Sequence, residues 1–130
     1  MNIIKRLTLI LLTAFISSTV FAQDITGSWK GVLKIQEMQI RVLFHIKKAG
    51  ETYQSTMDSP DQGAKGIPVT STSFENSTLK MTVANAGITY EGLLDNNDVI
   101  NGTFKQGGQS FPLNLLRSNV EEKAVRPKSR

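Results

Sequence analysis

The residues best suited to chemistry gather in one stretch, DSPDQGAKGIPV, which runs from Asp58 to Val69. Carboxylates and a lysine this close together could bind a metal, cradle a phosphate or exchange protons. A calcium loop of the EF-hand type needs oxygen ligands at alternate positions and then a distant glutamate, whereas Asp58 is followed by Asp61. A phosphate loop needs Gly-Lys-Ser/Thr at the start of a helix, whereas Lys65-Gly66 leads into an extended segment.

We therefore predict that this stretch is an ordered surface loop. Pro60 restricts the backbone, and Gly63 and Gly66 allow tight reversals. The functional alternative is a loop at the rim of a barrel, because loops often carry binding residues. Four polar side chains would then contact a ligand or a partner domain: Asp58, Asp61, Gln62 and Lys65.

His45 is the only histidine, and the chain has no cysteine. A general base needs a nucleophile or a substrate proton within reach, and a metal site needs several ligands. His45 lies between Leu43 and Lys47 on the outward phase of an extended segment. We therefore predict that it faces solvent or a partner. No catalytic residue, metal site or cofactor is predicted.

The elements that must position these groups are β-strands, because apolar and polar residues alternate along the chain. The clearest case is QIRVLFHIK, in which Ile40, Val42, Phe44 and Ile46 share one face. Connectors with Gly or Asn separate the strand patterns, as tight hairpins require. Similar patterns occur in SWKGVLKIQ, TLKMTVAN, GITYEGLLD, VINGTFKQ and SFPLNLLR, with weaker ones in TYQSTMD and IPVTSTSF.

These patterns predict an all-β fold, an antiparallel up-and-down meander of about eight strands. An open sheet of this size would expose two edges and a wet apolar face. We expect closure as a small lipocalin-like barrel, with a β-sandwich as the alternative. Inward positions carry aromatic and methionine side chains that form the core or partly line a small apolar pocket: Tyr53, Met57, Met81, Tyr90, Phe104 and Phe111.

The two ends of the chain differ from its body. Lys5 and Arg6 precede the apolar run LTLILLTAFISSTVFA, and Val20 and Ala22 suit a signal-peptidase site. Residues 1–22 are therefore predicted to be a signal peptide, with a retained membrane anchor as the alternative. The mature protein would be exported, to the periplasm or the extracellular space.

The rest of the chain is predicted to be one β-barrel domain, residues 23–117, and a charged linker or disordered tail, residues 118–130. From Gln23 to Arg117 there are 9 cations and 9 anions. A nucleic-acid-binding surface needs clustered cations, so no nucleic-acid partner is predicted.

The ends of the barrel domain carry a short motif. Gly27-Ser28-Trp29 opens the first strand and Arg117 closes the last, which resembles the lipocalin arrangement. The resemblance implies that the Arg117 guanidinium lies over the Trp29 indole and seals the barrel base, as a planar cation can. Trp29 as an ordinary core residue is the alternative.

A longer resemblance spans Asp24 to Leu116. The segments DITGSWKGVL, FHIKKAG, MDSPDQGAKGIPV, ANAGITYEG and GTFKQGGQSFPLNL resemble the small β-domain that precedes the catalytic domain of secreted bacterial α/β-hydrolases. VEEKAVRPKSR resembles the linker that follows it. The chain has no Gly-x-Ser-x-Gly motif, so the resemblance transfers no activity to it.

Together these features predict an exported, non-enzymatic binding or accessory module. It would hold a small apolar ligand or pack against a partner hydrolase domain, without nucleic acid, cofactor or membrane contact after signal removal. One alternative is an N-terminal fragment of a secreted esterase or peptidase that lacks its catalytic domain. Another is a structural protein with a filled interior.

Overall fold

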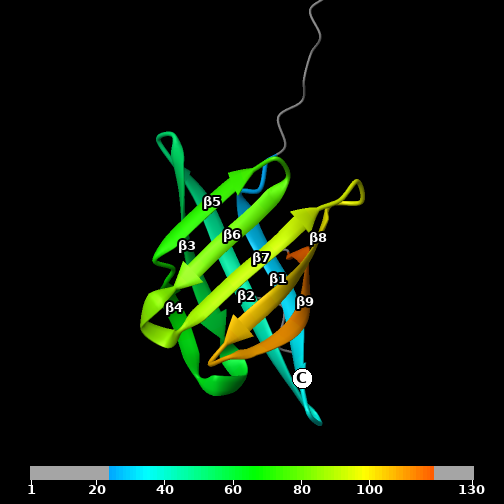
Figure 1. Ribbon diagram of the computed structural model, residues 1–130. Helices are drawn as coiled ribbons and strands as arrows, with labels where there is room; N and C mark the ends of the chain where they lie inside the picture. Colours follow the sequence, from blue (N-terminus) through cyan, green and yellow to red (C-terminus); the bar gives the residue numbers. More distant parts are fainter. Residues whose placement is uncertain (1–23, 119–130) are drawn as a thin grey trace, which may run out of the picture.

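The computed structural model describes residues 24–118. The predicted signal peptide and residues 119–130 of the predicted tail lie outside this range. Within it, nine antiparallel strands form one sheet in the order β4-β3-β2-β1-β9-β8-β7-β6-β5 (Figure 1). The strands are β1 (Gly27–Ile35), β2 (Met38–Ala49), β3 (Thr52–Ser59), β4 (Ala64–Pro68), β5 (Ser71–Glu75), β6 (Thr78–Val83), β7 (Ile88–Leu94), β8 (Val99–Gln106) and β9 (Gln109–Ser118).

Helical structure in the described range is limited to two single turns of 3-10 helix. These are η1 (Pro60–Gln62) and η2 (Ala84–Ala86), and each ends at a glycine in the left-handed conformation. None of the helical segments in residues 24–118 is long and apolar enough to cross a membrane. The prediction of an all-β antiparallel meander is confirmed.

The strand count is nine because the segment expected as one strand, IPVTSTSF, is divided between β4 and β5. The break falls at Val69 and Thr70, whose backbone N–H groups donate hydrogen bonds to two different strands. Val69 donates to the Ser55 carbonyl at 3.0 Å, and Thr70 donates to the Thr82 carbonyl at 2.7 Å. The chain thus leaves the β3 side and joins the β6 side at this point.

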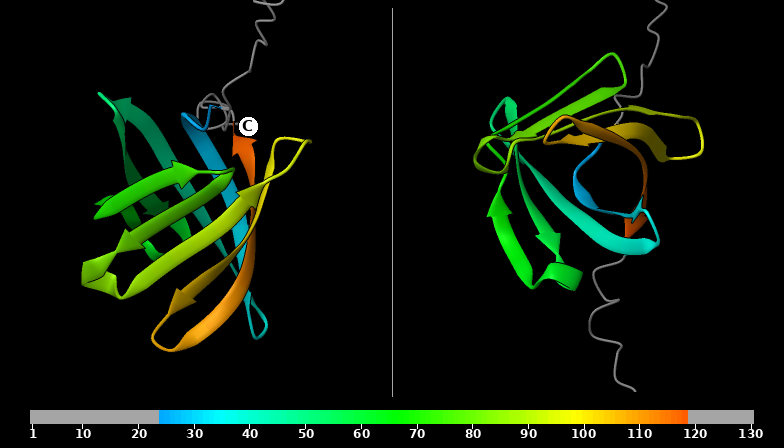
Figure 2. Two further views of the ribbon diagram at one scale, coloured as in Figure 1. Left: turned by 45° about the horizontal axis from the view of Figure 1, so that its top comes forward. Right: turned by 60° about the horizontal axis from the view of Figure 1, so that its bottom comes forward.

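The sheet curls into a half-barrel (Figure 2). Strand β1 pairs with both β2 and β9, so the sheet is continuous, and β4 and β5 remain its two edges. We call the interruption between β4 and β5 the seam. A side-chain hydrogen bond of 2.6 Å joins Ser55 on β3 to Thr72 on β5 across the seam. The seam is therefore held by side chains and by the Val69–Thr70 link, rather than by a strand ladder.

The concave side of the sheet is filled by the inward residues of the strands. Strand β7 shows the pattern, since its residues alternate between buried and exposed along its whole length. The largest fully buried side chains include Trp29, Phe44 and Tyr90, and the rings of the last two have centroids 5.9 Å apart. Burial of large apolar side chains of this kind is the main favourable contribution to folding.

Two glycines make room for Tyr90. Gly92 on β7 lies opposite Gly102 on β8, and a Cβ atom at Gly102 would overlap the Tyr90 hydroxyl. The hydroxyl donates a hydrogen bond of 2.8 Å to the Leu113 carbonyl on β9. Burial raises the pKa of the Tyr90 phenol, which therefore stays neutral and able to donate.

Substitution Gly102→Ala should lower the free energy of unfolding by about 1–3 kcal/mol, because the added methyl group displaces Tyr90 from its hydrogen bond. Urea unfolding followed by Trp29 fluorescence would measure this. The outward-facing neighbour Thr103 gives the control, since Thr103→Ala should change stability by only about 0.5 kcal/mol. Equal effects of the two substitutions would contradict the steric argument.

Candidate functional site

The stretch predicted to be a surface loop is mostly strand, because Asp58 and Ser59 end β3 and Ala64–Pro68 form β4, with η1 between them. Its two aspartates attach it to the neighbouring strand β2. The Asp61 carboxylate accepts hydrogen bonds from the Arg41 backbone N–H at 2.8 Å and from Arg41 Nη2 at 2.7 Å. Ser59 donates to the Gln62 side-chain oxygen at 2.7 Å, whereas Lys65 is exposed. Of the four polar residues expected at a rim, Asp58, Asp61 and Gln62 thus make contacts within the protein.

Asp58 links the loop to a second group of residues. Its Oδ1 accepts the Gly66 N–H at 2.7 Å, and its Oδ2 lies 2.8 Å from His45 Nε2. The other ring nitrogen, His45 Nδ1, lies 2.8 Å from Ser28 Oγ. Ser28, His45 and Asp58 therefore form a continuous hydrogen-bonded chain, which we call the Ser–His–Asp chain.

The proton positions in this chain follow from the donor inventory. A carboxylate only accepts hydrogen bonds, so His45 Nε2 carries the proton that is shared with Asp58. In the neutral imidazole Nδ1 is then an acceptor, and the Ser28 hydroxyl donates to it. This is the hydrogen-bond order of nucleophile, base and carboxylate, with the two ring nitrogens exchanged relative to the serine-protease pattern.

Burial by itself raises the pKa of Asp58. The hydrogen bonds from Gly66 and His45, with the charges of His45 and Lys65, outweigh this effect and hold the pKa below its usual value. Asp58 is therefore anionic at neutral pH. The side chains of His45 and Asp58 are 38% and 15% exposed, so the histidine remains accessible while the carboxylate is largely covered.

The register of two hairpins brings the Ser–His–Asp chain together. Ile35 pairs with Met38 at the β1–β2 turn, and counting outward from this pair places Ser28 opposite His45. On the other side His45 pairs with Thr56, so Asp58 is its diagonal neighbour on the same face. A register shift between Met57 and Ser59 in the pairing with β4 lies at Asp58, and bulges of this kind redirect side chains.

The prediction for His45 needs correction on this point. It was expected to face solvent or a partner, and its side chain is 38% exposed. A role as a general base was thought improbable, yet both ring nitrogens are hydrogen-bonded and one partner is a serine hydroxyl. Ser28 was noted only as part of the Gly-Ser-Trp motif. Counting residues along the first hairpin could have revealed the Ser–His–Asp chain. A tight turn after Ile35 fixes which residue of β2 lies opposite Ser28.

A groove of about 600 Å³ runs past this chain at the seam. Its walls come from β1, β2, β3 and the link between β4 and β5. Ser28, His45, Lys47 and Thr56 contribute polar groups, and Pro68, which pairs with Thr56, contributes apolar surface. Tyr53 and Val69 border the groove, but their side chains pack against the core. The groove is therefore lined mainly by polar side chains, with Pro68 as an apolar contact at its edge.

No family model, curated protein or solved structure matches the chain. The resemblances noted in the sequence consequently stay predictions, and the functional argument depends on the geometry of the chain itself. A second hollow, of about 660 Å³, lies over β6, β7 and β8 and is lined by residues such as Lys80, Glu91 and Thr103. We favour the groove at the seam because it contains two members of a nucleophile–base–carboxylate chain.

The six residues expected to form a core or line a pocket lie at different depths. Met57, Met81, Tyr90 and Phe104 are buried in the core, whereas Tyr53 and Phe111 are partly buried and pack against it. Only Tyr53 among them borders the groove at the seam, where its ring also has the Lys48 ammonium 5.1 Å from its centre. Their arrangement is that of packed core residues with Tyr53 at its margin.

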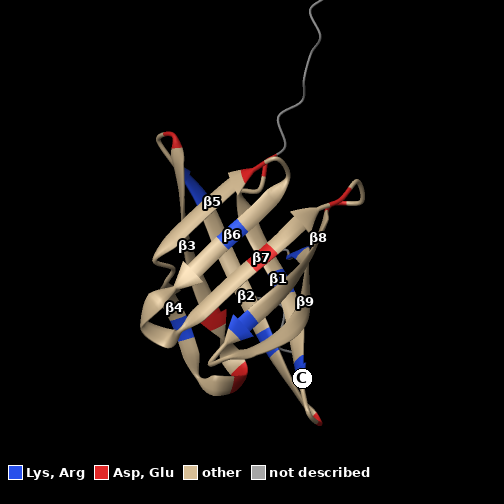
Figure 3. Cartoon of the chain, viewed as in Figure 1, with Lys and Arg blue, Asp and Glu red and all other residues tan. Residues whose placement is uncertain are grey.

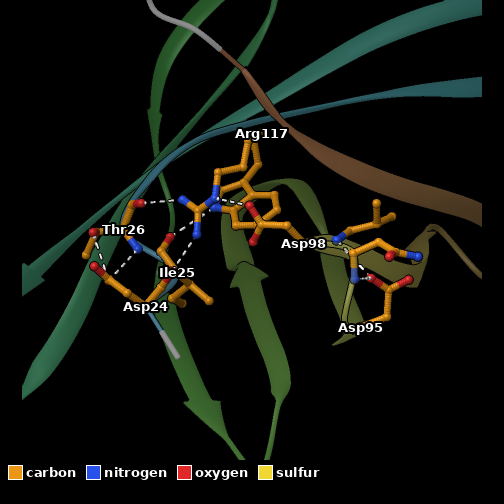
Figure 4. Close-up of polar contacts among 9 residues, drawn as sticks. Asp24, Ile25, Thr26, Asp95, Asp98 and Arg117 are labelled. Atoms are coloured by element: carbon orange, nitrogen blue, oxygen red, sulfur yellow. Dashed lines mark hydrogen bonds and ion pairs between the residues drawn. The ribbon is translucent and has the colours of Figure 1, made fainter. Parts of the chain in front are cut away.

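Arg117 and Trp29 meet where the first and last strands, β1 and β9, pair. The guanidinium lies 4.3 Å from the centre of the buried Trp29 ring. It also donates to the backbone carbonyls of Asp24 and Thr26 and to the Asp98 carboxylate (Figure 4). The Trp29 indole N–H in turn donates to the Ile25 carbonyl at 2.9 Å, so the segment before β1 is fastened at several points.

Charged residues elsewhere are distributed without a dominant sign. In Figure 3, Lys and Arg are interspersed with Asp and Glu over the strands and turns. Residues 24–118 contain no cluster of three or more His, Cys, Asp or Glu side chains suited to a metal ion.

Stability should depend on pH through Asp61. Hydrogen bonds from the Arg41 side chain lower the pKa of Asp61 to about 2, with help from the Arg41 backbone N–H. The unfolded value is about 3.9, so the stabilisation is complete above that pH and is lost as pH falls through about 2. Asp61→Asn should therefore lower the free energy of unfolding at pH 7, and its difference from wild type should vanish near pH 2.

Urea unfolding at several pH values between 7 and 2 would test this. Arg41→Gln removes the same ion pair from the other side and should reproduce the pH profile. A difference between wild type and Asp61→Asn that stays constant down to pH 2 would show that the ion pair is not the cause.

The stacking of Arg117 can be separated from its ion pair by two substitutions. Arg117→Lys should lower the free energy of unfolding by about 2 kcal/mol, because an ammonium cannot stack on Trp29 and also reach two carbonyls. Asp98→Asn removes only the exposed ion pair and should cost about 0–1 kcal/mol. Chemical unfolding followed by Trp29 fluorescence compares them, and equal losses would argue against stacking.

Proposed function

We propose that this domain is an exported binding module whose ligand site is the groove at the seam rather than the barrel interior. The observation that carries the proposal is the combination of a packed interior with an open groove. Inward side chains such as Phe44, Met81 and Tyr90 are at most 2% exposed, so they are committed to the core. The groove lies outside this packing and has about 600 Å³ of space.

The lining of the groove supports a particular kind of ligand. Pro68 offers apolar surface, and the Ser28–His45 pair offers a hydrogen-bonding group. Small-molecule sites typically combine a mostly apolar lining with a few placed polar groups. We therefore expect a small molecule with a short apolar group and a carbonyl or carboxyl end.

A second candidate function is docking to a partner hydrolase domain, as the resemblance implies. The observation that favours it is a set of exposed apolar residues on the outward side of the sheet, Val32, Leu93 and Leu116, which are 40–53% exposed. Leu116 pairs with Lys30 on one side and Val99 on the other, and Val32 follows Lys30 by two positions. Val32 and Leu116 are therefore neighbours on one face, and adjoining exposed apolar residues are typical of protein contact surfaces.

The groove proposal is tested by thermal unfolding with short-chain and medium-chain fatty acids and their methyl esters. A ligand present at 100 times its dissociation constant should stabilise the domain by about 2.7 kcal/mol, seen as a rise in Tm. Gln54→Trp places a large side chain in the groove and should abolish the rise.

The matched control is Thr103→Trp, which fills the second hollow and should leave the rise unchanged. A panel in which no compound raises Tm would reject the groove as a ligand site. Loss of the rise in Thr103→Trp alone would place the ligand over β6–β8 instead.

A further inference from the structure

We propose that Ser28 is a nucleophile that accepts an acyl group from carboxylic esters bound in the groove at the seam. The inference rests on the proposed function, because it uses the same groove, and it adds a reactive residue and a substrate class. The starting point is the Ser–His–Asp chain, in which both His45 nitrogens lie 2.8 Å from their partners. A serine hydroxyl becomes a useful nucleophile when an adjacent base can take its proton and a third group orients that base.

Each member of the chain is held in place by a different part of the fold. Ser28 and His45 are opposite one another in the β1–β2 ladder, so their backbones are fixed. Asp58 is anchored at its other oxygen by the Gly66 N–H, where the φ of Gly66 is 69°. Asp58 can therefore hold the His45 ring in one orientation and one tautomer, which is the role of the carboxylate in such chains.

Access to the nucleophile comes from the groove. Ser28 and His45 both line it, and neither is fully buried. Lys47 lies two residues from His45 and lines the same groove, so a cation is available to the negative charge that develops on the carbonyl oxygen. Pro68 lines the same groove and gives the acyl group of an ester an apolar contact.

The reaction balances with these groups and water. Ser28 Oγ attacks the ester carbonyl carbon while its proton passes to His45 Nδ1, and Asp58 stabilises the imidazolium. The bond between the carbonyl carbon and the alcohol oxygen then breaks, and the leaving alcohol takes the proton from Nδ1. Acyl-Ser28 and a free alcohol result, and a water molecule activated by the same nitrogen releases the carboxylic acid and restores the hydroxyl.

The test uses a fluorophosphonate, which reacts with activated serines and stays attached, and p-nitrophenyl acetate as a substrate. Peptide mapping by mass spectrometry of the labelled wild-type protein should place the adduct on Ser28. Exposed Ser73 on β5, outside the groove, is the internal reference. Activation by a general base contributes about 100-fold or more, so labelling at Ser28 should exceed labelling at Ser73 by that factor.

Variants show whether labelling of Ser28 depends on His45 and Asp58 or only on exposure of the hydroxyl. Ser28→Ala should lose both the adduct and p-nitrophenol release, and His45→Gln should lower both by about 100-fold. Asp58→Asn should lower them as well and move the pH at which the rate is half-maximal, which a purely structural role would not do. Ser73→Ala should leave both readouts unchanged, and a Tm measurement confirms that each variant is folded.

Labelling of Ser28 no faster than that of Ser73, or labelling that His45→Gln leaves unchanged in a folded protein, would overturn the inference. The ligand-induced rise in Tm keeps the two proposals apart. A wild-type protein that shows this rise without labelling at Ser28 retains the binding function and rejects the nucleophile. Labelling at Ser28 without any rise in Tm supports the nucleophile and rejects the binding function.

Discussion

The pairing of the first strand with the last is the constraint on which the rest of the structure depends. Strands β1 and β9 meet at Trp29 and Arg117, and the guanidinium fastens this junction by lying over the indole and binding the carbonyls before β1. The hairpins of β1–β4 and of β5–β9 are otherwise joined in sequence only through the Val69–Thr70 link. Because β1 and β9 pair, the apolar faces of the two groups turn toward each other and share one core, which removes a large apolar surface from water.

Closure at one side leaves the opposite side open. The groove reaches this opening at Val69 and Thr70, while its other end, at Ser28, lies beside the β1–β9 junction. The ladder stops between β4 and β5, where single hydrogen bonds from the link and the Ser55–Thr72 contact replace strand pairing. An unpaired sheet edge exposes backbone groups and side chains that a closed barrel would cover. One end of the groove lies at this seam and the rest runs over β1, β2 and β3, while the interior is occupied by its own side chains.

The Ser–His–Asp chain also shows how loop and sheet depend on each other. The loop after β3 is attached to β2 through Asp61 with Arg41, and Asp58, near the end of β3, binds both His45 on β2 and the Gly66 N–H after the loop. Such contacts between a carboxylate and a hydrogen-bond donor order a loop whose backbone has few partners of its own. The same Asp58 contact that orders the loop orients the His45 ring toward Ser28, so structural and chemical roles share one carboxylate.

The all-β class and the inward set of side chains could be predicted from the sequence because the two-residue period of a strand is a local property. The Arg117–Trp29 contact could be expected only through a resemblance, since the residues are far apart in the chain. The division of one expected strand into β4 and β5 was missed. The chain passes from β3 to β6 at Val69 and Thr70, and this depends on hydrogen-bond partners in those strands rather than on the local sequence pattern.

The sequence by itself therefore determined the strands, their inward faces and most of their turns. Only the tertiary structure decided where the sheet stays open, and that Ser28, His45 and Asp58 meet across β1, β2 and β3. The physical reason is that side-chain alternation is encoded residue by residue, whereas contacts between strands depend on register and closure, which many distant residues set together.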